Sequence, residues 1–104
     1  MTQVLSKSIP KFRLGQLIAT PGAIAALQRS QQEPLEFIQR HRGGDWGEVD
    51  DGDKALNDEA IAHEGDSDRQ SRVLSAYRTT AGDRIWIITE HDRSVTTVLL
   101  PEEY

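Results

Sequence analysis

The chain has 104 residues, of which 37% are hydrophobic and 28% are charged, a length and balance typical of one globular domain. Its formal net charge of −5 disfavours non-specific binding to nucleic acid, because the phosphate backbone repels an acidic protein. Cysteine is absent, which excludes disulfides, thiolate metal sites and cysteine nucleophiles and fits a reducing compartment.

The N-terminal region predicts a flexible tail over residues 1–10, followed by a single α+β domain over residues 11–104. It lacks the features of a signal peptide. No stretch approaches the roughly 20 apolar residues that a membrane-spanning helix needs. We therefore expect a cytoplasmic protein that makes no membrane contact.

Short elements fill the first part of the domain. Residues 12–19 (FRLGQLIA) are apolar enough for a short strand. The Thr20-Pro21 dipeptide predicts a helix start, because Thr caps helices and Pro is favoured at the first helical position. A second helix is expected from Pro34 to the Gly43-Gly44 pair, which stops it.

An acidic segment follows the loop Asp45-Trp46-Gly47, and Lys54 is the basic residue that opposes its carboxylates. A helix is expected within it over about residues 53–63. The expected buried residues of this helix are Leu56, Ala60 and Ile61.

The C-terminal third predicts three antiparallel strands. Residues 72–79 alternate in polarity, residues 84–90 (RIWIITE) form a β-branched and aromatic run suited to a central strand, and residues 94–100 precede a proline. The short turns between them predict a meander, which the N-terminal strand joins and which about three short helices cover on one face. The expected core includes Leu27, Phe37, Ile85, Ile87, Val95 and Leu99.

Five segments carry a resemblance: ATPGA (residues 19–23), GDWG (44–47), LSAY (74–77), IWIITE (85–90) and DRSVTTVLLPEEY (92–104). They resemble a family of small bacterial proteins found around plasmids and integrated mobile elements, over roughly residues 12–104. Members are labelled plasmid-related protein or subunit M of a type I restriction enzyme. A methyltransferase subunit would need a glycine-rich loop for its methyl donor and a catalytic motif for a flipped base, and this sequence has neither. The resemblance therefore implies a mobile-element setting and no particular chemistry, and residues 62–70 depart from it.

The three histidines each lie near an acidic residue in the sequence. A general acid–base pair or a metal site would need such groups within hydrogen-bond or ligand distance. The sequence has no HExxH or HxH motif, and we expect no cofactor and no metal. One alternative stays open, a small hydrolase or nuclease of a toxin-like kind. Its reacting groups would be His41, Asp45, His91 and Arg93.

We predict a non-enzymatic accessory or regulatory binding protein whose acidic segment meets a basic protein surface. In the implied setting, the partner would be a host defence complex, CRISPR-Cas or restriction. Direct nucleic-acid binding is not expected. Trp46 either anchors its loop in the core or makes an exposed contact. The predicted partner-binding residues are Asp45, Trp46, Glu48, Asp50, Asp51, Asp53, Asp58, Glu59, Asp92 and Arg93.

Overall fold

The computed structural model describes residues 10–104, and the predicted flexible tail lies outside the described residues except for Pro10. Within that range the chain forms three α-helices, a four-stranded sheet and a short 3-10 helix, which confirms the predicted α+β class. The elements are β1 (Gln16–Ala19), α1 (Pro21–Ser30), α2 (Pro34–Arg42), α3 (Asp51–Ala62), β2 (Val73–Arg78), β3 (Arg84–Thr89), β4 (Val95–Leu99) and η1 (Pro101–Glu103).

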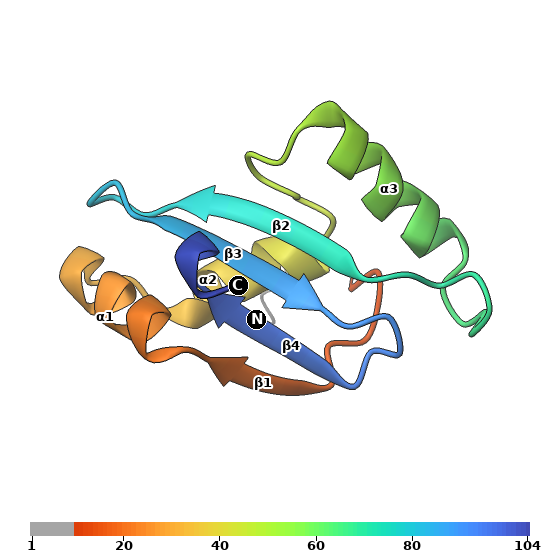
Figure 1. Ribbon diagram of the computed structural model, residues 1–104, viewed down its shortest axis with the longest axis horizontal. Coiled ribbons are helices and arrows are strands. Elements are labelled where there is room, and N and C mark those ends of the chain that lie inside the picture. The colour runs from red at the N-terminus through yellow and green to blue at the C-terminus, as the bar shows by residue number, and fades with distance from the viewer. Residues whose placement is uncertain (1–9) are drawn as a thin grey trace, which may run out of the picture.

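The sheet has the strand order β1-β4-β3-β2 (Figure 1). Strands β2, β3 and β4 form the predicted antiparallel meander with β3 in the middle. Strand β1, from the N-terminal part of the domain, pairs with β4 and runs parallel to it, with Gln16 opposite Val95 and Ala19 opposite Val98. The sheet therefore has β1 at one edge and β2 at the other.

The first two helices begin at the predicted positions because the local sequence satisfies their free backbone amides. Thr20 accepts a hydrogen bond from the amide of Ala23 at 3.2 Å, and a proline occupies the first turn of both α1 and α2. Gly43 follows the last residue of α2. Local residues thus mark both starts, a capping threonine and a proline in α1 and a proline without a side-chain cap in α2.

The main core lies between the sheet and the helices α1 and α2. Strand register places Tyr77, Ile85, Ile87 and Val98 on one face of the sheet. Of the predicted core residues, all but Val95 are buried; Val95 is half-buried at the start of β4. The residues that α1 and α2 contribute to this core are Ala23, Ala26, Leu27, Phe37 and Ile38.

Helix α3 lies beside β2, at the edge of the sheet, whereas α1 and α2 cover one face (Figure 1). The Asn57 side chain of α3 bonds both backbone groups of Leu74 in β2, at 2.7 and 3.1 Å. The prediction that Leu56 is buried is wrong: this side chain is 61% exposed. Ala60 is buried as predicted and Ile61 is half-buried, whereas Asn57, which was not predicted, is the other buried residue of the helix.

Candidate interaction site

Charge is distributed unevenly along the chain. Residues 45–68 contain ten of the 17 acidic residues and one of the 12 basic residues, a formal charge of −9. The rest of the chain contains 11 basic and seven acidic residues, a formal charge of +4. Because α3 and its flanking loops make up this segment, the negative charge is concentrated beside β2.

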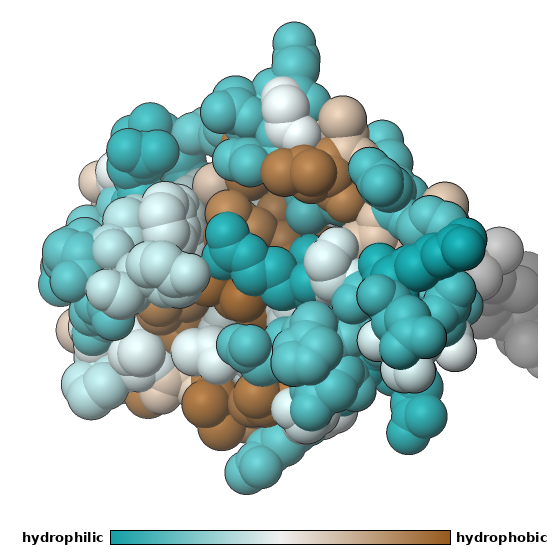
Figure 2. All heavy atoms as spheres, turned by 45° about the vertical axis from the view of Figure 1, so that its right-hand side comes forward, coloured by the Kyte–Doolittle hydropathy of each residue, from teal (hydrophilic) through white to brown (hydrophobic). Residues whose placement is uncertain are grey.

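The acidic surface, as we name it, is formed by α3 and the loop that precedes it. Five of its six carboxylate residues are exposed and the sixth, Asp53, is half-buried. Figure 2, which brings the right-hand side of Figure 1 forward, shows a mostly hydrophilic face with hydrophobic atoms in a central hollow. The residues of the acidic surface are Glu48, Asp50, Asp51, Asp53, Asp58 and Glu59.

Two members of the acidic surface also stabilise the fold. Asp50 caps α3 by accepting a hydrogen bond from the amide of Asp53 at 2.7 Å. Asp58 accepts a hydrogen bond from Nε1 of Trp46 at 3.0 Å. Acidic residues in the first turn of α3 also interact favourably with the helix dipole. Part of the negative charge of the acidic surface therefore belongs to residues that stabilise the fold.

Of the other four carboxylates, the half-buried Asp53 lies in the first turn of α3, and the three exposed ones are held loosely or not at all. Glu48 lies 3.5 Å from Arg78, and both side chains are about half exposed, so this pair stabilises the fold by about 0–1 kcal/mol. Asp51 and Glu59 have no hydrogen bond or ion pair from their side chains within residues 10–104. These three carboxylates are available to a partner.

Trp46 is buried and anchors the loop before α3. Its ring centroid lies 6.2 Å from that of Phe12 and 6.1 Å from that of His41, and its carbonyl accepts the amide of Ala76 at 3.1 Å. Gly47 follows with φ +72°, and a Cβ there would lie 2.0 Å from the Ala76 carbonyl oxygen, which requires glycine. The core interpretation of Trp46 is confirmed, and its indole ring is not an exposed contact.

Arg93 is also buried and joins the β3–β4 turn to the segment that follows α3. Its guanidinium donates to the Glu64 carboxylate at 2.8 and 3.1 Å. It also donates to the carbonyls of Ser71 and Glu90 at 2.7 and 3.0 Å. This pair could not be predicted from the sequence, because Glu64 lies 29 residues away in a segment without a regular pattern. Arg93 therefore stabilises the fold and does not belong to the acidic surface.

Asp45 and Asp92 are exposed but have local partners. Partial burial would raise the pKa of Asp45, but hydrogen bonds from Arg40 and the Gly47 amide, together with the charge of Arg40, lower it. The Arg40 guanidinium lies 2.7 Å from the Asp45 carboxylate. Hydrogen bonds from Ser94 lower the pKa of Asp92, and the Ser94 amide lies 3.0 Å from it. Both carboxylates thus stabilise turns.

A buried chain of hydrogen bonds crosses the sheet from α2, and the sequence analysis did not identify it. The Leu14 carbonyl can only accept, so the Thr96 hydroxyl donates to it at 2.7 Å and accepts from Thr89 at 2.7 Å. Thr89 in turn accepts from Nε2 of His41 at 2.9 Å, which leaves Nδ1 to accept from Ser75 at 2.6 Å. The hydrogen-bond directions therefore place a proton on Nε2, which is the tautomer of the neutral form of His41.

The pKa of His41 agrees with this neutral form. Burial, and to a smaller extent the positive charge of Arg93, lower it to about 3. Both ring nitrogens of His41 are hydrogen-bonded, so this side chain contributes to the fold. Because it is fully buried, no substrate can reach it.

The four residues of the hydrolase or nuclease alternative have separate surroundings. His41 is fully buried, whereas Asp45 pairs with Arg40 at the surface. His91 is exposed in the β3–β4 turn, and its backbone carbonyl, at 3.4 Å, is the part that contacts Arg93. This arrangement supplies no shared cavity in which the four could act on one substrate.

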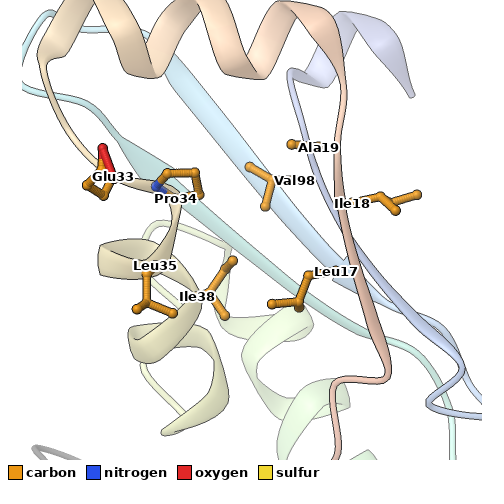
Figure 3. A pocket seen from close by; sticks show the side chains of 8 residues that line it. All are labelled: Leu17, Ile18, Ala19, Glu33, Pro34, Leu35, Ile38 and Val98. Atoms are coloured by element: carbon orange, nitrogen blue, oxygen red, sulfur yellow. The ribbon is translucent and has the colours of Figure 1, made fainter.

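A second feature, an apolar hollow of about 330 Å³, lies between β1 and α2 (Figure 3). Three residues with large exposed hydrophobic side chains contribute to its lining within the described surface, namely Leu17, Ile18 and Leu35, and of these the Ile18 side chain points away from it. The sequence of β1 predicts a short strand but gives no sign of this hollow.

No helix within residues 10–104 is long and apolar enough to cross a membrane. The same residues contain no group of three or more His, Asp or Glu side chains placed to hold a metal ion. Comparison of the chain with protein-family models, with curated proteins and with solved structures finds no match.

Proposed function

We propose that the chain is a non-enzymatic binding protein whose acidic surface docks onto a basic surface of a partner protein. The observation that carries this proposal is the formal charge of −9 on residues 45–68, against +4 on the rest of the chain. A basic partner is attracted to the α3 side of the molecule and repelled by the remainder. Charge thus favours one orientation of the complex.

The acidic surface is held in place before any partner arrives. Asn57 ties α3 to the backbone of β2, and Asp58 ties the middle of α3 to Trp46. Binding therefore requires little ordering of the backbone. Leu56 is exposed on the same helix and adds an apolar contact among the charges, as is usual in protein interfaces.

The resemblance to mobile-element proteins supports a specific class of partner. A host defence complex, CRISPR-Cas or restriction, must present a basic surface to hold nucleic-acid phosphates. The acidic surface would occupy that surface and exclude the nucleic acid. We propose such a complex in the cytoplasm as the partner.

The experiment compares the capture of a partner from a cell extract by three forms of the chain. The first is the wild type. The second carries Glu48→Gln, Asp51→Asn and Glu59→Gln, which remove charge without touching the Asp50 cap or the Asp58 bond to Trp46. We expect the second to lose the captured protein, and the wild type to lose it as salt rises, because exposed charges are screened over about 10 Å at 0.1 M.

The matched control carries Glu36→Gln, Glu90→Gln and Glu102→Gln, which remove the same charge from exposed positions outside the acidic surface. It should capture the same protein as the wild type. Equal loss in both triple variants would mean that net charge, and not the acidic surface, governs binding. Capture that persists in the first triple variant would refute the proposal.

A further inference from the structure

The two edges of the sheet differ in whether their backbone groups are covered. At the β2 edge, Asn57 bonds the backbone of Leu74. Residues 46–48 bond the backbone of Ala76 at 3.1 and 2.6 Å. The outward-facing groups of Leu74 and Ala76 therefore already have partners, so no further strand can pair along this part of β2 without displacing them.

At the β1 edge, every second residue has its backbone N–H and C=O groups facing outward, away from β4. The amides of Gln16 and Thr20 donate to carbonyls on the β4 side at 3.0 and 2.9 Å. Because backbone groups alternate in direction along a strand, the N–H and C=O groups of Leu17 and Ala19 point away from β4. Two residues that flank Ile18 thus present donors and acceptors to the open side.

The side chains of β1 are apolar and exposed. Leu17 is 47% exposed and Ile18 is 45% exposed, and Leu35 of α2 is 52% exposed nearby. In Figure 3, Leu17 points toward Ile38 across the apolar hollow, and Ile18 points to the other side of the strand. Natural proteins usually protect an edge strand with a charge or a proline, and β1 (QLIA) has neither.

We propose that β1 pairs with β1 of a second copy of the chain, antiparallel and with a two-fold axis at Ile18. Leu17 then faces Ala19 of the second copy and exchanges both backbone hydrogen bonds with it, and the reverse pair does the same. Ile18 faces its own counterpart as a non-hydrogen-bonded pair. The two sheets become one sheet of eight strands, and Leu17 of the second copy lies on the side of the apolar hollow.

Charge and geometry favour a second copy over other occupants. Residues 14–19 carry no charge, so two copies of a chain with net charge −5 can meet there without local repulsion. Among the described residues that line the hollow, Glu33 alone is charged, which gives a charged peptide little to recognise. Because the β2 edge is covered, pairing closes as a dimer and does not extend into a filament.

The first test measures the molar mass of the full chain by sedimentation equilibrium over a range of concentrations. We expect a dimer of twice 11.6 kDa. Ile18→Lys should give a monomer, because it places two like charges opposite each other at the two-fold axis. Leu56→Lys, which changes another exposed apolar residue far from β1, should remain a dimer. A circular dichroism melt checks that each variant is folded.

The second test fixes the register by disulfide formation. The natural chain has no cysteine, so Ile18→Cys introduces one thiol per copy. In the proposed pairing the two Cα atoms lie about 4.5 Å apart, within disulfide range, and mild oxidation should link the copies. In Gln16→Cys the two thiols are offset by four residues, roughly 13 Å along the strands, and should stay reduced.

Three results would overturn this inference. The first is a wild-type chain that stays monomeric up to about millimolar concentration, which would leave β1 open to a strand of a different protein. The second is a dimer that survives Ile18→Lys. The third is cross-linking of Gln16→Cys as fast as that of Ile18→Cys. None of these results depends on the acidic surface, so the two proposals can fail separately.

Discussion

At the scale of single residues, the buried polar groups are the least expected feature of the molecule. His41, Ser75, Thr89 and Thr96 are all buried, yet each has a hydrogen-bond partner in the chain that runs from α2 to Leu14. A buried network of this kind stabilises one arrangement of the core only while every member is satisfied. Protonation of His41 would break that condition.

We predict that the stability of the protein falls with pH below the ordinary pKa of histidine. The folded-state pKa of His41 is about 3, below its ordinary value of 6.5, so the unfolded chain gains a proton that the folded chain does not. The stability from the neutral ring is fully present above pH 6.5 and is lost as the pH falls toward 3. The loss should be about 1.4 kcal/mol per pH unit.

Urea denaturation between about pH 6.5 and 5 isolates this effect, because carboxylates titrate mainly below that window. His41→Gln should abolish the slope in this window, whatever its effect on absolute stability. His91→Gln, which changes an exposed histidine, should keep the wild-type slope. A wild-type slope in the His41 variant would show that His41 is not the titrating group.

Arg93 gives a second prediction at this scale. Arg93→Ala removes the three hydrogen bonds to Glu64 and leaves the carbonyls of Ser71 and Glu90 without this donor. We expect a loss of about 2–4 kcal/mol in the free energy of unfolding, less than for a fully buried pair because Glu64 can be partly hydrated. Arg78→Ala breaks the exposed pair with Glu48 and an exposed hydrogen bond of 3.4 Å to the Gly82 carbonyl, and should cost about 0–1 kcal/mol. Similar losses in both variants would contradict the structural role of Arg93.

At the scale of elements, the sequence predicted those whose signals are local. The Thr20-Pro21 and Pro34 starts, and the short turns of the β2–β3–β4 meander, depend on residues that are neighbours in the chain. Contacts between distant residues gave no such signal, as Arg93 and Glu64 show. The sequence pattern of α3 also did not indicate that Asn57, and not Leu56, faces β2. Asn57 faces inward because its side chain bonds the backbone groups of Leu74 that β3 leaves unpaired.

The same reasoning applies to the candidate site. The acidic residues could be recognised as a group in the sequence, but not which of them are engaged in folding. Asp50 and Asp58 have partners that only the structure identifies. The open β1 edge was hidden because openness depends on where β2 and its covering groups lie. The hydroxyls of Ser75, Thr89 and Thr96 share a face with buried apolar residues, so strand alternation could have indicated them.

We predict that Asn57 protects the β2 edge. Asn57→Ala leaves the N–H and C=O groups of Leu74 without their partners and should reduce stability by about 1–3 kcal/mol. Hydrogen exchange at the Leu74 amide should become faster than in the wild type. Lys54→Ala, on the exposed side of the same helix, should change stability by no more than about 0.5 kcal/mol. Unchanged exchange at Leu74 in the Asn57 variant would rule out this role.

At the scale of the whole molecule, the two proposed surfaces lie at opposite edges of the sheet. Strand β1 carries the self-association edge, and α3 flanks β2 at the other end of the order β1-β4-β3-β2 (Figure 1). A dimer formed through β1 therefore presents an acidic surface at each end of one eight-stranded sheet. Such a dimer can engage two basic sites at once, which raises its effective affinity for a partner with repeated sites.

The last prediction concerns stability as a function of protein concentration. If the folded chain is a dimer and the unfolded chain is not, mass action makes folding more favourable as concentration rises. Each tenfold increase should add about 0.7 kcal/mol per subunit, which shifts the urea midpoint upward by roughly 0.5 M for a chain of this size. The Ile18→Lys midpoint should not depend on concentration, whereas the Leu56→Lys midpoint should follow the wild type. A wild-type midpoint that stays constant over a hundredfold range of protein concentration would mean that the folded unit is a monomer and that β1 remains an open edge.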